Sequence, residues 1–271
     1  MTAFDTLLEE HGEHVELRGR VLRCPVATSA AGNSMDGPRT ASATALLQAI
    51  ADGGTSAVGA VVLFGAGTSF CTGGNVKGFG AADDPGPYVS GVARTFHDFI
   101  LAVTRVPVPV VAAVHGWAAG AGMSIALACD LVVGGPATKF RPAYPAIGFT
   151  PDGGMSWLLP KIVGPIRARD MLLTDAVVGG EEAERLGLLS RLVPDDRVQA
   201  EAQLVAEQLA QGPTGALGRI KRLAWESADR GLAEHLPHEA RSIGESAASP
   251  GGREGVRAFA ERRPADFSTT W

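Results

Sequence analysis

Residues 58–77 read VGAVVLFGAGTSFCTGGNVK, an apolar run followed directly by a glycine-rich loop. The run from Val58 to Phe64 is continuous, which is typical of a strand covered on both faces of a sheet. Clustered glycines, as in Gly65 to Lys77, mark places where the backbone closely approaches a ligand or another segment. The stretch therefore predicts a buried strand that ends in a binding or packing loop.

The same succession of strand and helix continues along the chain. Further strands are predicted over residues 15–21, 108–114 and 130–133, and helices over residues 40–51 and 88–103. Residues 28–39 and the acidic segment 83–87 are predicted to be loops, the second of them mobile. Short apolar strands that alternate with helical segments predict an α/β fold with parallel strands.

The pattern changes near Pro194, where strands give way to helices. Three helices are predicted beyond it, over residues 197–211, 213–228 and 252–263. We therefore expect an α/β core over residues 1–194 and a helical region over residues 195–271. This region is small and amphipathic, so it is expected to pack on the core or on another subunit.

Composition excludes several classes of protein. The chain has 271 residues and a net charge of −5, which argues against a general nucleic-acid binder. Its three cysteines have no short spacing, so neither a disulfide framework nor a metal site is expected. No signal peptide is recognisable, and the longest apolar run is too short to span a bilayer. A cytoplasmic protein without membrane contact is expected.

Two glycine clusters follow neighbouring predicted strands, Gly73–Gly74 and Gly120–Gly122. Open α/β sheets bind ligands beyond the carboxyl ends of their strands, and the second cluster also opens a helix. Two backbone N–H groups aimed at one oxygen there would stabilise negative charge. The alternative is that the glycines only allow tight turns and close packing.

Other motifs fit the sequence less well. A phosphate-binding loop needs Gly-Lys-Ser/Thr, but Asn75 follows Gly74, and no complete dinucleotide fingerprint is present. Residues 122–126 approximate the nucleophile elbow of hydrolases, which would make Ser124 a nucleophile. The alternative for Ser124 is a small residue on a packed helix.

Taken together, these loops resemble the crotonase superfamily, the enoyl-CoA hydratase/isomerase family. The resemblance rests on residues 61–77, 107–122, 130–131 and 254–264, and it covers about residues 55–265. It implies a spiral of ββα turns with a C-terminal helical region for trimerisation or capping. It also implies a homotrimer or dimer of trimers and an acyl-CoA thioester substrate. No separate cofactor is implied, because coenzyme A is part of the substrate.

The resemblance assigns roles position by position. The two N–H donors of the oxyanion hole fall on Gly74 and Ala121. The residues expected to line CoA or the acyl group are Thr72, Gly73, Asn75, Val76, Ser124, Pro142, Ala143, Tyr144 and Ile147. The segment 33–35 resembles another CoA-contacting stretch. Basic residues that either meet CoA phosphates or remain solvated are Lys77, Lys221, Arg222, Arg262 and Arg263.

The acid–base residues depart from the hydratase pattern. The two glutamates of family hydratases fall on Ser124 and Tyr144, so neither carboxylate is present. Asp152 instead resembles the carboxylate of isomerase-type members, such as the phenylacetyl-CoA ring-epoxide isomerase. A turn-forming Asp before two glycines is the alternative.

Three functions are consistent with this sequence. An enoyl-CoA double-bond isomerase would use Asp152 as acid and base. The alternatives are an enoyl-CoA hydratase acting on an unusual acyl group and a catalytically silent acyl-CoA-binding relative. Residues 80–95 and those near Tyr144 are expected to select the acyl group.

Overall fold

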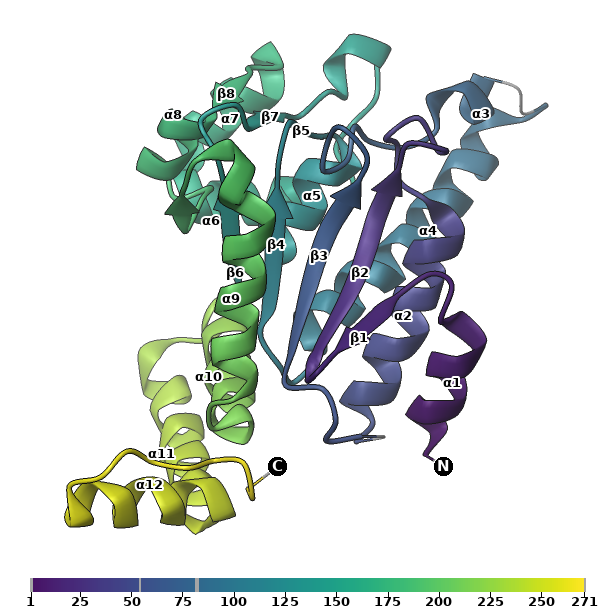
Figure 1. Ribbon diagram of the computed structural model, residues 1–271. Helices are drawn as coiled ribbons and strands as arrows, with labels where there is room; N and C mark the ends of the chain where they lie inside the picture. Colours follow the sequence, from purple (N-terminus) through teal and green to yellow (C-terminus); the bar gives the residue numbers. More distant parts are fainter. Residues whose placement is uncertain (1, 54, 81–82, 271) are drawn as a thin grey trace.

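A six-stranded sheet forms the centre of the computed structural model, which describes residues 2–53, 55–80 and 83–270 (Figure 1). Its strand order is β1-β2-β3-β4-β6-β9; β1 is antiparallel to β2, and the strands from β2 onward are parallel. The strands are β1 (Glu16–Arg18), β2 (Val21–Thr28), β3 (Ala60–Ala66), β4 (Val110–Val114), β6 (Leu131–Gly134) and β9 (Arg191–Leu192). The predicted α/β class with parallel strands is confirmed. The single strand predicted over 15–21 covers β1, the turn at residues 19–20 and the first residue of the longer β2.

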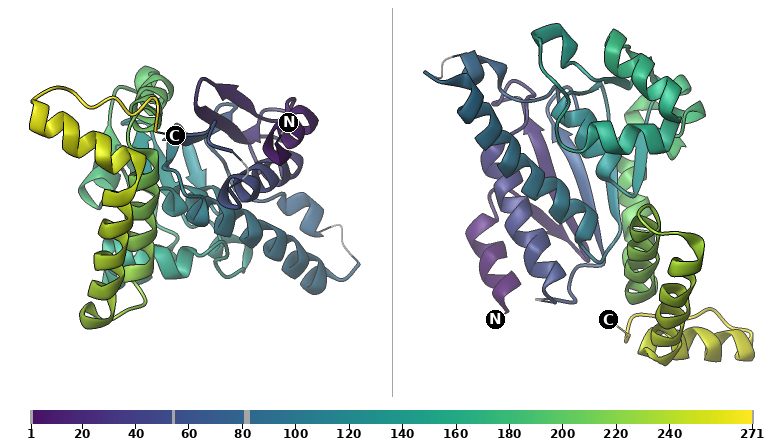
Figure 2. Two further views of the ribbon diagram at one scale, coloured as in Figure 1. Left: turned by 90° about the horizontal axis from the view of Figure 1, so that it is seen from below. Right: turned by 180° about the vertical axis from the view of Figure 1, so that it is seen from behind.

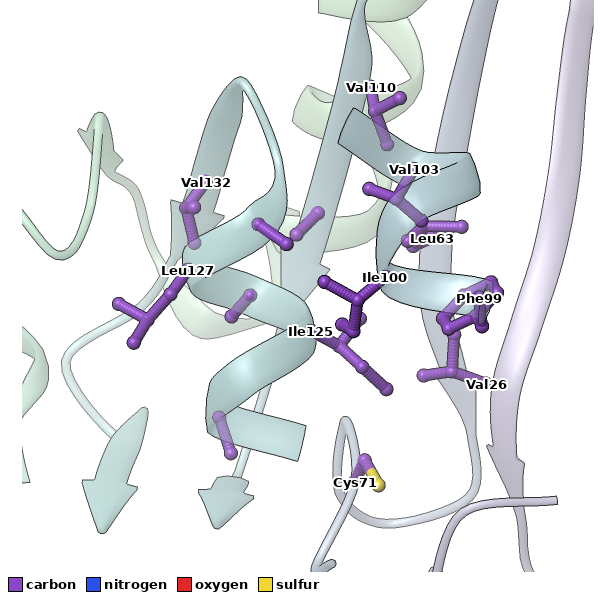
Figure 3. Packing of buried hydrophobic residues seen from close by; sticks show 14 of the residues in the cluster. Val26, Leu63, Cys71, Phe99, Ile100, Val103, Val110, Ile125, Leu127 and Val132 are labelled. Carbon is purple, nitrogen blue, oxygen red and sulfur yellow. The ribbon is translucent and has the colours of Figure 1, made fainter. Parts of the chain in front are cut away.

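The continuous apolar runs are explained by burial of both sheet faces. Alternate residues of a strand point to opposite faces, so Val61 and Leu63 lie in one core while Ala60 and Val62 lie in the other. Helices α2 (Gly37–Ala51), α4 (Pro85–Arg105) and α5 (Ala121–Ala128) cover the first face, where Leu63, Phe99, Ile100, Val103 and Ile125 lie against one another (Figure 3). Helix α9 (Val198–Ala210) covers the second face.

A second, three-stranded sheet carries the chain out of the first. It consists of β5 (Trp117–Ala119), β7 (Lys139–Arg141) and β8 (Val178–Gly179), in that order. Only two residues, His115 and Gly116, separate β4 from β5, so the loop after β4 turns sharply. Strands of two or three residues are too short for an alternation pattern to reveal, and the sequence did not predict them.

The remaining elements are α1 (Ala3–His11), α3 (Val76–Gly80), η1 (Pro145–Ile147), α6 (Met155–Val163), α7 (Pro165–Thr174), α8 (Gly180–Arg185), η2 (Asp195–Arg197), α10 (Thr214–Ser227), α11 (Leu232–Ala248) and α12 (Pro250–Glu261). The loop predicted over 83–87 is wrong in part, because α4 begins at Pro85. Proline fits the first helical turn, where its missing N–H leaves no hydrogen bond unmade. Helix α11 was missed because Pro237 lies inside it.

The last three helices, α10 to α12, lie toward the amino ends of the parallel strands, opposite the edge where the strands end (Figures 1 and 2). The first predicted tail helix, α9, instead packs on the sheet, so the projecting part begins at α10. The division at residue 194 into an α/β core and a C-terminal helical region stays a prediction. In the described residues, no helix is long and apolar enough to cross a membrane.

Lys221 anchors this projecting part to the core. Its Nζ lies 2.9 Å from Asp130 Oδ2 and donates to the carbonyl oxygens of Val103 (2.8 Å) and Val108 (3.2 Å). Burial lowers the pKa of Lys221, against the opposing effect of the Asp130 charge. The candidate role of Lys221 at a CoA phosphate is therefore wrong, because its charge is buried and already engaged.

Replacing Lys221 by Met is expected to lower the free energy of unfolding by about 3 kcal/mol, because it leaves Asp130 without its cation and two buried carbonyl groups without a donor. Urea unfolding followed by circular dichroism would measure the change. Lys139→Met is the matched control, since Lys139 is exposed and its ammonium group lies 5.2 Å from the centre of the Trp117 ring. Equal losses in the two variants would show that the buried pair contributes nothing special.

Candidate active site

The loop that carries Gly74 is held by the segment around Asn33. The Asn33 carbonyl accepts the N–H of Thr72 at 2.8 Å, and the Asn33 side chain accepts that of Thr68 at 2.9 Å. The N–H of Met35 donates to the Gly73 carbonyl at 2.7 Å. The segment 33–35 therefore holds the predicted CoA-contacting loop in place through these hydrogen bonds.

The second loop, at Gly120–Ala121, is fastened to the first by a short parallel bridge. The backbone N–H of Cys71 donates to the Trp117 carbonyl at 3.0 Å, and the N–H of Ala119 donates to the Cys71 carbonyl at 2.9 Å. The approach is so close that a Cβ on Gly122 would lie 2.2 Å from the Cys71 oxygen. Glycine is required there, and it lets the two predicted donor loops meet.

The N–H groups of Gly74 and Ala121 are unused within the described part of the chain, where none of the hydrogen bonds engages them. Ala121 is the first residue of α5, so its N–H belongs to the free amino end of a helix with its partial positive charge. A Cβ built on the adjacent Gly73 would lie 3.9 Å from the Ala121 nitrogen, so the loops are in contact. The two N–H groups therefore lie on adjoining loops and have no partner in the described residues, whereas their role as an oxyanion hole stays a prediction.

Asp152 lies against helix α5, and the turn formed by the two glycines that follow it holds it there. Gly153 and Gly154 have φ of +59° and +79°, which favours glycine. A Cβ on Gly153 would lie 2.3 Å from the Phe96 ring and 2.8 Å from Ser124 Cβ, so only glycine fits. The Ser124 hydroxyl donates to the Asp152 carbonyl oxygen at 2.9 Å, which ties the turn to α5.

Tyr144 contacts the carboxylate directly. Its hydroxyl donates to Asp152 Oδ1 at 2.6 Å, and its side chain is buried. Burial raises the pKa of Tyr144, and the nearby Asp152 charge raises it further, so the phenol keeps its proton and remains a donor. The two positions that lack the hydratase glutamates, Ser124 and Tyr144, thus both hold Asp152 with O–H groups.

The backbone that presents Tyr144 is fixed by Asp175, a residue that sequence reasoning missed. Ala143 has a φ of +64°, which is unfavourable for a residue with a Cβ. Its N–H donates to Asp175 Oδ1 at 2.6 Å, and Arg141 donates to Asp175 Oδ2 at 2.6 and 2.9 Å. No local signal could have found Asp175, because it lies 32 residues along the chain from Ala143.

The other predicted contact residues surround these groups. Thr72, Asn75, Val76 and Ile147 are exposed, whereas Gly73 and Pro142 are buried. The Lys77 side chain, like residues 81 and 82 of the segment predicted to select the acyl group, lies outside the described part of the chain. Arg263 forms an ion pair with Glu254 at 2.7 Å, so it is engaged within the tail.

The geometry around Ser124 contradicts the interpretation of this residue as the nucleophile of a hydrolase. Ser124 is fully buried within α5, and its hydroxyl bonds the Asp152 carbonyl. In the described residues its Oγ makes no hydrogen bond to a histidine. Residues of α10 line two cavities of about 880 and 610 Å³. Gly74, Ala121 and Asp152 are not among the residues that line either cavity. Within the described residues, no three His, Cys, Asp or Glu side chains are grouped so that they could hold a metal ion.

Comparison with known proteins assigns the chain to a family. Residues 33–270 match the family model described as Enoyl-CoA hydratase/isomerase. Over 210 residues, the chain is 40% identical to a Rhodobacter capsulatus protein named "Probable enoyl-CoA hydratase", covering 77% of this chain and 80% of that one. It is 34% identical over 213 residues to the 1,2-epoxyphenylacetyl-CoA isomerase of Escherichia coli, with the same coverages, 77% and 80%.

The fold agrees. A crystal structure of an enoyl-CoA hydratase from Polaromonas sp. JS666 superimposes with a TM-score of 0.87 at 30% identity, covering 93% of this chain and 98% of that one. The chain belongs to the enoyl-CoA hydratase/isomerase family of the crotonase superfamily, and it has the crotonase fold predicted from its sequence. It is an enzyme of that family, whose substrates are acyl-CoA thioesters.

Proposed function

We propose that this enzyme is an enoyl-CoA double-bond isomerase in which Asp152 moves the proton. The observation that carries the proposal is the environment of Asp152. Its carboxylate accepts the Tyr144 hydroxyl at 2.6 Å, and its backbone carbonyl accepts the hydroxyl of Ser124, on the helix that opens with the Ala121 N–H. A single carboxylate suffices for a double-bond shift, whereas the family's hydratase pattern uses two.

The proposed reaction starts from a 3-enoyl-CoA. The thioester oxygen accepts the N–H groups of Gly74 and Ala121, while residues 72–76 contact the CoA. Asp152 removes a proton from the α carbon, and the electron pair moves onto the thioester oxygen as an enolate. Each N–H donor lowers the barrier by about 3 kcal/mol, because the oxygen carries more charge in the enolate than in the substrate. Asp152 then returns the proton to the γ carbon, which leaves the double bond between the α and β carbons.

In this mechanism Tyr144 and Ser124 position the carboxylate. Replacing Tyr144 by Phe is expected to lower kcat about tenfold, with KM changed by less than about twofold, because it removes a hydrogen bond to a charged group but keeps the ring. Steady-state kinetics with a 3-enoyl-CoA would measure both constants, and the melting temperature would verify folding. A rise in KM with kcat unchanged would instead make Tyr144 a residue of the acyl pocket.

A panel of CoA thioesters tests the proposed reaction. We expect conversion of 3-enoyl-CoA to 2-enoyl-CoA, followed by the absorbance of the conjugated thioester. Hydration of crotonyl-CoA at a comparable rate would favour the second candidate, a hydratase, which the "Probable enoyl-CoA hydratase" relative supports. Binding of acyl-CoA in calorimetry without turnover of any thioester would identify a silent relative and overturn the proposal.

We also propose that the tail assembles the enzyme as a homotrimer or a dimer of trimers. Large apolar side chains are exposed on α10, α11 and α12, at Ile220, Leu232, Leu236, Ile243, Val256 and Phe259. Such surface is typical of an interface between copies of a chain. Light scattering should give a mass of three or six chains, and a monomer would contradict the proposal.

A further inference from the structure

Three aromatic rings from separate elements gather beside the Gly74 loop. Phe79 of α3 stacks on Phe149, with ring centroids 6.2 Å apart and planes at 21°. The ring of Tyr88, in the first turns of α4, meets Phe79 edge-on at 6.4 Å and 66°. These three rings are called the aromatic wall below.

The aromatic wall lies near both the proposed N–H donor at Gly74 and the proposed acid–base residue Asp152. Near the donors, a Cβ built on Gly74 would lie 3.1 Å from Phe79 Cζ. Near the acid, the N–H of Phe149 donates to the Tyr144 carbonyl at 3.0 Å, and Tyr144 bonds Asp152. The rings therefore connect the first donor to the carboxylate along one side.

The opposite side is closed by α5. Asp152 is bonded to Ser124, and the Ser124 N–H donates to the Gly120 carbonyl at 3.1 Å. Gly120 in turn contacts the Gly73 loop, since a Cβ built on it would lie 3.5 Å from Gly73 Cα. These contacts form a closed circuit of residues. An acyl group whose carbonyl oxygen met the two donors would therefore have both Asp152 and the aromatic wall close by.

The aromatic wall is not part of the packed core. Phe149 is 39% exposed and Tyr88 is 47% exposed, and Phe79 is only partly buried. Aromatic rings stabilise most when buried, and they interact best with other rings in offset or edge-on arrangements. Phe79 and Phe149 already show the offset arrangement, which a further planar ring would extend.

We propose that the acyl group bound by this enzyme is aromatic: its 3-enoyl chain carries a phenyl-sized ring, which stacks on Phe79 and Phe149. The proposal rests on the proposed function, because that function places the thioester oxygen at Gly74 and Ala121. It names the substrate class of the same site. A saturated chain or ring would gain apolar contact here but no ring stacking.

Two unreactive ligands of equal carbon number separate these possibilities. Phenylacetyl-CoA and cyclohexylacetyl-CoA differ only in the aromaticity and flatness of the ring, and neither contains a double bond that this isomerase would shift. Calorimetry on the intact protein should show phenylacetyl-CoA binding about fivefold more tightly. Free CoA, measured in parallel, gives the affinity of the shared nucleotide part.

The variants Phe79→Leu and Phe149→Leu should reduce this ratio to about one, because leucine keeps the apolar area but removes the ring. Trp157→Leu is the matched control. Trp157 is also half-exposed (43%) and stacked on another ring, that of Trp225 at 6.3 Å, but it lies outside the circuit. That control should keep the wild-type ratio.

The outcomes separate the two proposals. Equal binding of both ligands, or a ratio unchanged by Phe79→Leu and Phe149→Leu, would overturn the aromatic acyl group and leave the isomerase proposal standing. A loss of both ligands in equal measure in those variants would also overturn it, since the wall would then be merely apolar. If neither thioester binds more tightly than free CoA, the aromatic acyl group is overturned, and the isomerase proposal is decided separately by the turnover of 3-enoyl-CoA.

Discussion

Replacing Asp152 by Asn is expected to lower kcat for the isomerisation of a 3-enoyl-CoA by about 10³-fold. Positioned acid–base groups contribute about 10²- to 10⁴-fold to a rate, and in the proposed reaction one carboxylate performs both proton transfers. Asparagine has nearly the same shape, and its amide oxygen can still accept the Tyr144 hydroxyl that now lies 2.6 Å from Asp152 Oδ1. The fold and the affinity for substrate should therefore be almost unchanged.

The measurement is steady-state conversion of 3-enoyl-CoA, combined with calorimetric titration of an unreactive acyl-CoA to verify binding. Asp98→Asn is the matched control, since Asp98 is an exposed carboxylate on α4. It should retain the wild-type kcat. Full isomerase activity in Asp152→Asn would mean that Asp152 only forms the turn before Gly153 and that another group moves the proton.

The strands and donor loops could be predicted because each depends on a local pattern. The apolar run up to Phe64 indicates a strand buried on both faces, and the structure places Val61 and Val62 in different cores. The parallel pairing of β3 with β4 then brings the loops after them to one edge of the sheet. Local sequence therefore predicted the neighbourhood of Gly74 and Ala121, although not the hydrogen bonds through Cys71 that join their loops.

What the sequence did not reveal depends on contacts between distant residues. Asp175 stabilises the positive φ of Ala143 from another part of the chain, and nothing around either residue indicates the pairing. Phe79 and Phe149 are 70 positions apart in the numbering, and each alone is an ordinary apolar residue. Their stacking exists only because α3 and the segment after η1 meet beside the Gly74 loop.

Replacing Gly122 by Ala is expected to separate the two donor loops and to lower both activity and stability. The added methyl group would lie 2.2 Å from the Cys71 oxygen and 2.8 Å from its carbonyl carbon, and these backbone atoms cannot rotate aside. Either α5 moves, and Ala121 with it, or the loop segment around Cys71 moves, and Gly74 with it. In both cases the N–H groups of Gly74 and Ala121 could no longer donate to the same thioester oxygen.

The effect on catalysis should be large because the donors act only when both reach the same oxygen. Losing one of them raises the barrier by about 3 kcal/mol, so kcat should fall by about 10²-fold or more. Overpacking should also lower the free energy of unfolding by about 2 kcal/mol. Steady-state kinetics and urea unfolding would measure the two effects.

Gly244→Ala is the matched control, because Gly244 lies within α11 and a Cβ there meets nothing within 4 Å. Alanine is the better helix former, so this variant should gain about 0.5 kcal/mol of stability and keep its kcat. If Gly122→Ala loses stability but retains full kcat, the N–H groups do not need their close mutual approach. The thioester oxygen would then be held by something other than the pair at Gly74 and Ala121, and the enolate mechanism would have to be rebuilt around that group.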